Sequence, residues 1–63
     1  MVKIVFDTED DQFCDENGNK VEEFIKIYTI RILEKIVSDI ENGDDYGAIM
    51  SVNGNKLGTW EID

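Results

Sequence analysis

The fold of this chain of 63 residues is decided by residues 20–41, KVEEFIKIYTIRILEKIVSDIE. Apolar side chains recur there at the spacing of a helix, which turns about 100° per residue, and they predict one long helix over residues 20–42. The inner of two apolar stripes consists of Val21, Phe24, Ile25, Tyr28, Ile32 and Ile36, and the outer stripe consists of Ile30, Leu33, Val37 and Ile40. Because a single apolar band is enough to seat a helix on a core, we expect the outer stripe to be covered by a second copy or a partner. The alternative is a sheet that bends around the helix and covers this stripe in part.

Both ends of the helix carry termination signals. Asn19, followed three residues later by Glu22, predicts a capping box, in which each side chain bonds to a free backbone N–H at the start of the helix. Asn42 and Gly43 follow the last periodic residue, and glycine takes the left-handed conformation that closes many helices.

Alternating apolar residues predict strands on both sides of the helix. Residues 2–7 predict a first strand, and residues 46–62 predict a hairpin around Asn53-Gly54. A two-residue turn places Ile49 opposite Gly58, whereas a three-residue turn with a bulge places Ala48 opposite Trp60. We favour the second register, because it gathers one apolar face, Ala48, Met50, Val52, Trp60 and Ile62. We expect Trp60 to lie in the core rather than to anchor a partner.

This order of elements predicts a single α+β domain over residues 1–63. Its compact solution is a βαββ fold, a three-stranded antiparallel sheet in the order 1-3-2 with the helix on one face. A domain of about 60 residues buries only about 60% of its unfolded surface, and Cys14, the one cysteine, cannot form an intramolecular disulfide. We therefore expect a homodimer, formed through the outer stripe or through the free edge of the first strand.

The charge of the chain favours basic protein partners. Fifteen acidic and six basic residues give a net charge of −9, which repels nucleic acid and anionic membranes. The acidic side chains are dense in a predicted loop over residues 8–19, where we expect the partner-binding residues to be Glu9, Asp10, Asp11, Asp15 and Glu16.

The residue types argue against catalysis, cofactors and metals. The chain has no histidine, which removes the usual general base and the commonest metal ligand. Asp15, Asn17 and Gly18 match the middle of a calcium loop, but the same frame places Phe13 and Phe24 where carboxylates are required. Cys14 lies among acids, which disfavour a reactive thiolate. We therefore predict that the protein is not an enzyme. The lone thiol and the lack of a signal peptide or membrane-spanning segment predict that it lies in the cytoplasm.

Three segments carry a resemblance to a group of known proteins. Residues 32–36 (ILEKI), 41–43 (ENG) and 47–60 (GAIMSVNGNKLGTW) resemble small acidic orphan proteins of bacteriophages and prophages, some of which inhibit CRISPR or other antiviral systems. The resemblance implies a non-enzymatic phage protein in the host cytoplasm that inhibits a nucleic-acid-handling defence protein by acidic surface competition. The alternative is a homo-oligomeric assembly module whose charge serves solubility alone.

Overall fold

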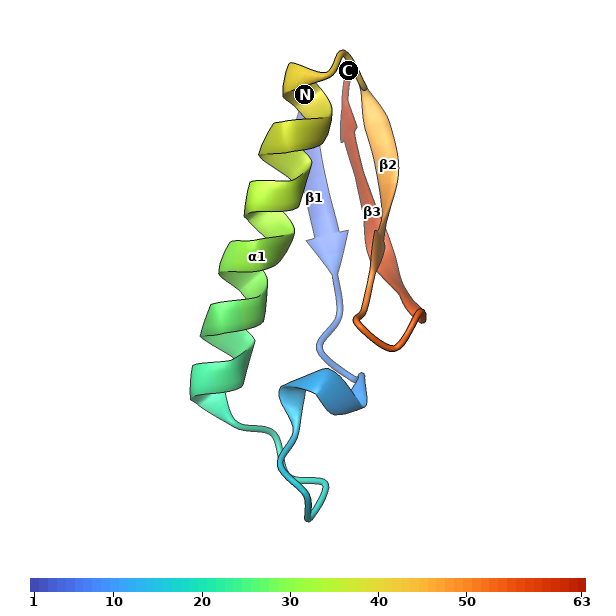
Figure 1. Cartoon of the computed structure of the whole chain (residues 1–63). Helices are drawn as coiled ribbons and strands as arrows, with labels where there is room; N and C mark the ends of the chain where they lie inside the picture. The colour runs from blue at the N-terminus through green and yellow to red at the C-terminus, as the bar shows by residue number, and fades with distance from the viewer.

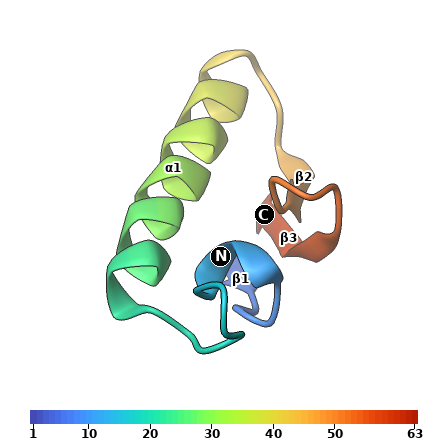
Figure 2. The same ribbon diagram turned by 60° about the horizontal axis from the view of Figure 1, so that its bottom comes forward.

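One helix lies along one face of a three-stranded antiparallel sheet in this computed structural model, which describes residues 1–63 (Figures 1 and 2). In chain order the elements are β1 (Val2–Phe6), η1 (Asp11–Phe13), α1 (Glu22–Glu41), β2 (Tyr46–Met50) and β3 (Lys56–Ile62). The strands lie in the order β1-β3-β2. This arrangement confirms the predicted α+β βαββ fold.

The hairpin register that we favoured is wrong. Ile49 lies opposite Gly58 and Gly47 lies opposite Trp60, as the shorter turn predicts, and the pairing then shifts so that Met50 faces Lys56. The shift leaves Leu57 without an opposite residue, and its side chain is buried. The predicted apolar face is therefore wrong as well, because Ala48, Met50 and Val52 are exposed whereas Ile49 and Leu57 join the core.

A serine explains this register. The hydroxyl of Ser51 accepts hydrogen bonds from the backbone N–H groups of Asn53 (3.2 Å) and Asn55 (3.1 Å). The backbone N–H of Ser51 also donates to the carbonyl of Asn55 at 2.8 Å, so the turn is closed by these two residues. Gly54 supplies the left-handed conformation at φ 84°, and the Asn-Gly pair acts inside a longer loop.

The predicted capping box is also wrong, whereas the predicted helix end is confirmed. Helix α1 starts after Val21, which makes no side-chain cap bond. Asn19 is held instead in a turn, because its backbone N–H donates to the Asp15 carboxylate at 3.0 Å and its carbonyl accepts from the backbone N–H of Asp15 at 2.8 Å. At the other end Gly43 has φ 99°, in the left-handed region that closes the helix.

The core is small and includes a residue from the predicted acidic loop. Its six buried apolar side chains are Phe13, Ile32, Ile36, Ile49, Leu57 and Trp60. Trp60 therefore lies in the core, as expected. Phe13 is fully buried, and its ring meets that of Tyr28 edge to face at a centroid distance of 6.0 Å. The loop over residues 8–19 is thus part of the folded core through η1.

The molecule is elongated and exposes more surface than a compact chain of its size. Its extents are 39 × 20 × 16 Å, and its radius of gyration is 12.4 Å, against about 11 Å for a compact domain of this length. The accessible surface is 4670 Å², whereas a folded monomer of 7.2 kDa exposes about 4,100 Å². Roughly 500 Å² is therefore in excess of the average for a folded monomer of this mass.

Candidate interaction surfaces

The carboxylate of Asp10 bonds within the protein. One oxygen accepts from the backbone N–H of Gln12 at 3.0 Å and from the side-chain amide of Asn53 at 2.8 Å. The other oxygen accepts from the side-chain amide of Asn55 at 2.8 Å. The bond from Asn55, followed by that from Gln12, lowers the pKa of Asp10 from 3.8 to about 2, because donors to a carboxylate stabilise its charged form. Asp10 is buried, so it is not presented to a partner.

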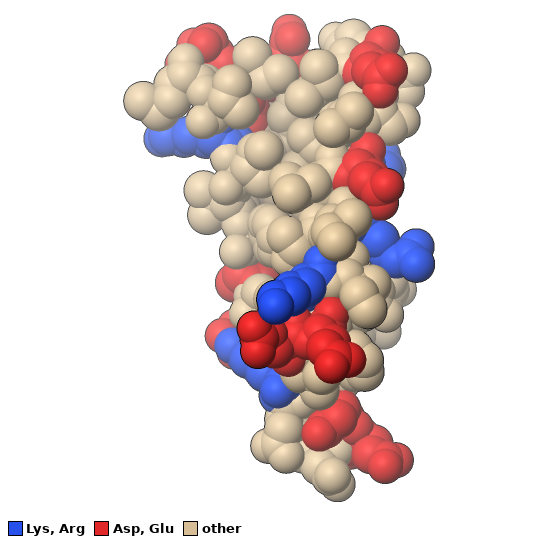
Figure 3. Space-filling model, turned by 90° about the vertical axis from the view of Figure 1, so that its left-hand side faces the viewer, with Lys and Arg blue, Asp and Glu red and all other residues tan.

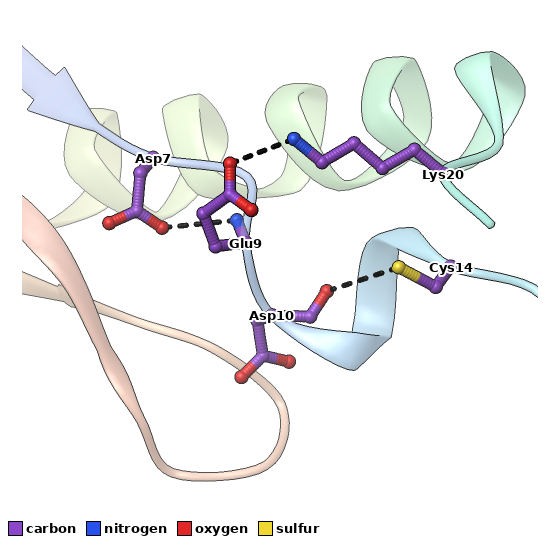
Figure 4. Close-up of polar contacts among 5 residues, drawn as sticks. All are labelled: Asp7, Glu9, Asp10, Cys14 and Lys20. Carbon is purple, nitrogen blue, oxygen red and sulfur yellow. Dashed lines mark hydrogen bonds and ion pairs between the residues drawn. The ribbon is translucent and has the colours of Figure 1, made fainter. Parts of the chain in front are cut away.

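A second side chain fastens the same loop to the hairpin. The side-chain carbonyl oxygen of Gln12 accepts a hydrogen bond of 2.6 Å from the backbone N–H of Val52. We call this group the clasp: Asp10, Gln12, Ser51, Asn53 and Asn55. Figure 4 shows the Asp10 side chain directed toward the β2–β3 turn. The clasp and the burial of Phe13 fix the loop at the end of the molecule opposite both chain termini (Figure 1).

The remaining predicted partner-binding acids lie at the surface. Glu9 pairs with the Lys20 ammonium at 2.9 Å (Figure 4), and its hydrogen bond raises the pKa of Lys20. Asp15 accepts backbone N–H groups of the turn through one oxygen. Asp11 and Glu16 are exposed. The structure therefore separates the five predicted residues into one buried carboxylate and four exposed ones.

The outer stripe of α1 is only partly covered. Ile30, Leu33, Val37 and Ile40 are 57%, 41%, 54% and 38% exposed. Figure 3 views the molecule from the helix side, where uncharged atoms form a broad area bordered by acidic groups above and below. The stripe is thus covered in part, which agrees with the bent-sheet alternative and still leaves much of its surface exposed. The inner stripe needs one change, because Phe24 is also exposed, at 37%.

A groove of about 410 Å³ separates α1 from β2. Its apolar wall includes four core side chains, Ile32, Ile36, Ile49 and Trp60. Arg31, Lys35 and Asp39 also line it, and the last two pair at 2.6 Å. This volume falls within the range of small-ligand sites. The groove also shows that α1 is displaced from β2, and at 100° per residue the outer stripe lies on the opposite flank of the helix, toward β1.

No group of three or more Cys, Asp or Glu side chains is placed to hold a metal ion. No helix in the structure combines the length and the apolar character needed to cross a membrane. No protein-family model, curated protein or solved structure matches the chain.

Sequence reasoning missed the clasp, although its residues carried two local signals. Asp10 precedes Gln12 at the spacing of a turn in which a carboxylate accepts the N–H two residues on, and Phe13 is a large apolar residue among acids. Neither signal names the distant partner, because Asn53 and Asn55 lie 43 and 45 positions from Asp10.

Proposed function

We propose that this protein is a homodimeric binding module that occupies a basic surface of another protein and competes with nucleic acid for that surface. The carrying observation is the exposed acidic loop, held in place by the buried Asp10 carboxylate and Phe13. A loop already ordered before binding loses less conformational entropy on binding. Its carboxylates meet basic side chains that otherwise bind phosphate, and such pairs steer association and set specificity.

The resemblance to phage proteins supports a more specific role. On that basis the target is a nucleic-acid-handling protein of a bacterial antiviral system, and the protein acts as a non-enzymatic inhibitor. The net charge of −9 supports a basic target.

Two charge-reversal variants with the same net charge test whether the acidic loop binds the partner. The loop variant is Asp11→Lys/Glu16→Lys, because neither side chain makes a hydrogen bond within the protein, whereas Asp10 and Asp15 hold the loop together. The control is Glu41→Lys/Glu61→Lys at the other end of the molecule, and either pair of reversals takes the net charge from −9 to −5. Tagged proteins capture partners from a bacterial host lysate, and the purified partner is then titrated with each variant.

We expect the loop variant to lose the partner and the control to keep it. Binding of the wild type should weaken strongly between about 0.05 and 0.5 M salt, because screening shortens the range of exposed charges. Equal capture by both variants contradicts binding through the loop.

A second candidate function is a homo-oligomeric assembly module with no inhibitory role. The roughly 500 Å² of excess surface favours it. Salt separates the two functions, because self-association of a chain with charge −9 should be unchanged or strengthened as salt screens repulsion between copies. A mass larger than a dimer in sedimentation, together with no captured partner, supports assembly.

A further inference from the structure

The free edge of β1 presents a defined row of backbone groups. The N–H of Asp63 donates to the Met1 carbonyl at 3.0 Å, and the N–H of Asp7 donates to the Leu57 carbonyl at 3.1 Å. Backbone groups alternate in direction along a strand, so the odd-numbered residues of β1 bond to β3. The N–H and C=O groups of three residues then point to the open edge: Val2, Ile4 and Phe6.

This edge carries one feature that disfavours strand addition, a lysine, and lacks the others. Protected edges are very short or carry a bulge, a proline or charged side chains, lysine above all. β1 pairs with β3 without a register shift and contains no proline. Its one charged residue is Lys3. Val2 and Ile4, which share the face of the buried Trp60, remain 62% and 39% exposed. The other edge strand, β2, has a register shift at its end.

The β1 edge and the outer stripe lie on the same flank of the molecule. The groove separates α1 from β2, so the outer stripe faces the β1 side. In Figure 1 the C-terminal half of α1, which carries the stripe, runs at the height of β1. One partner can therefore cover both.

We propose that a second copy of this chain adds to the β1 edge, so that β1 pairs with its equivalent antiparallel about a two-fold axis at Ile4. The two sheets join into one of six strands, and the outer stripes of the two helices pack against each other above it. This geometry rests on the homodimer of the proposed function and specifies its interface.

Self-complementarity favours a second copy as the occupant. A two-fold axis at Ile4 places Val2 opposite Phe6 and Lys3 opposite Val5, so that no like charges meet across the strands. The stripe residues at 30, 33, 37 and 40 are symmetric about residue 35, as two antiparallel helices require. Packed helices lie about 8–10 Å apart and strands about 4.8 Å apart, so each helix of the dimer spans the width of about two strands. The roughly 500 Å² of excess surface is more than half of the about 800 Å² that each partner buries in a stable interface.

Disulfide trapping between two different variants tests this register. Both variants carry Cys14→Ser, and one adds Lys3→Cys whereas the other, with a larger affinity tag, adds Val5→Cys. Because the even-numbered residues bond across the axis, residues 3 and 5 of different copies form a non-hydrogen-bonded pair with Cα atoms about 4.5 Å apart, within disulfide range. Identical positions lie about 8 Å apart, which is too far.

We expect the mixture to form a disulfide between the two variants and each variant alone to form none. A dimer in sedimentation that gives no such cross-link overturns the β1 pairing while leaving the proposed dimer in place. A protein that stays monomeric well above micromolar concentration overturns both the β1 pairing and the proposed homodimer. The outer stripe and the β1 edge would then be covered by a different protein, which the capture experiment would identify.

Proline substitution gives an independent test. Val2→Pro removes an N–H that points to the open edge, so it removes no bond to β3, and its side chain is already exposed. We expect a loss of dimer affinity of at least about tenfold with an unchanged helical circular dichroism spectrum. Val5→Pro, in contrast, removes a bond to Thr59 and should unfold the chain. An unchanged dimer affinity of Val2→Pro contradicts the proposal.

Discussion

Phe13→Ala tests whether the acidic loop belongs to the folded core. Phe13 is fully buried and lies edge to face with Tyr28, yet it belongs to a segment that is otherwise polar. Truncating a buried phenylalanine to alanine costs about 3–5 kcal/mol, because the cavity closes only partly. A chain of 63 residues is stable by about 3–9 kcal/mol in all. The substitution should therefore remove a third or more of the free energy of unfolding.

This loss of free energy of unfolding should lower the Tm of Phe13→Ala strongly. In domains of this size 1 kcal/mol moves the Tm by about 4–8 °C, so a loss of about 3 kcal/mol lowers it by at least about 12 °C. Thermal unfolding is followed by circular dichroism and by the emission of Trp60, the only tryptophan. All variants are compared at one protein concentration, because the proposed dimerisation would make the Tm depend on concentration.

Phe24→Ala is the matched control, since it removes the same ring from a side chain that is already 37% exposed. We expect it to lower the Tm by less than half as much. Equal shifts for the two variants, or a shift below about 4 °C for Phe13→Ala, would show that the loop is not part of the core.

Three further predictions concern the clasp and the sheet. The pKa of Asp10 is lowered from 3.8 to about 2 in the folded protein, so its contribution to stability is complete above about pH 4 and is lost as the pH falls toward about 2. Urea unfolding at several pH values should give a flatter profile for Asp10→Asn than for the wild type over this window, and parallel profiles contradict the clasp. An alanine Cβ at Gly58 would clash with the backbone carbonyl oxygen of Val5. Because backbone cannot move aside as a side chain can, Gly58→Ala should cost more than about 2 kcal/mol and expose β1 to hydrogen exchange. Wild-type protection of β1 in this variant refutes the clash. A Cβ at Gly47 would lie 2.7 Å from the indole nitrogen of Trp60, so Gly47→Ala should shift the emission of Trp60 to longer wavelength, and unchanged emission shows that the indole does not rest on this glycine.

The elements and their order were predictable because their signals are local. The helix follows from apolar spacing within residues 20–41, and its end follows from Gly43. The βαββ order leaves few compact arrangements for so short a chain. The exposure of the outer stripe was predictable for the same reason, since one face of a sheet covers one flank of a helix.

The errors arise where side chains compete with backbone preferences. Three residues lie between Ser51 and Asn55, as in the turn that we favoured, but the Ser51 hydroxyl accepts two N–H groups and fixes this turn one residue earlier than predicted. Asn19 has the composition of a helix cap, but the Asp15 carboxylate holds it in a preceding turn. In each case a single polar side chain two to four residues away decides the local geometry, and composition alone does not rank these competing bonds.

The positions of the two surfaces allow self-association and target binding to occur together. The acidic loop lies at the end of the long axis opposite the chain termini (Figure 1), whereas the outer stripe lies on the C-terminal half of α1. An antiparallel dimer about Ile4 therefore buries the stripe and places its two acidic loops at opposite ends. Two loops on one rigid body bind a target with two basic sites more tightly than one loop does, because the second contact forms at a high effective concentration. In the proposed dimer the excess apolar surface would have a functional role, because it would join two acidic loops into one bivalent ligand.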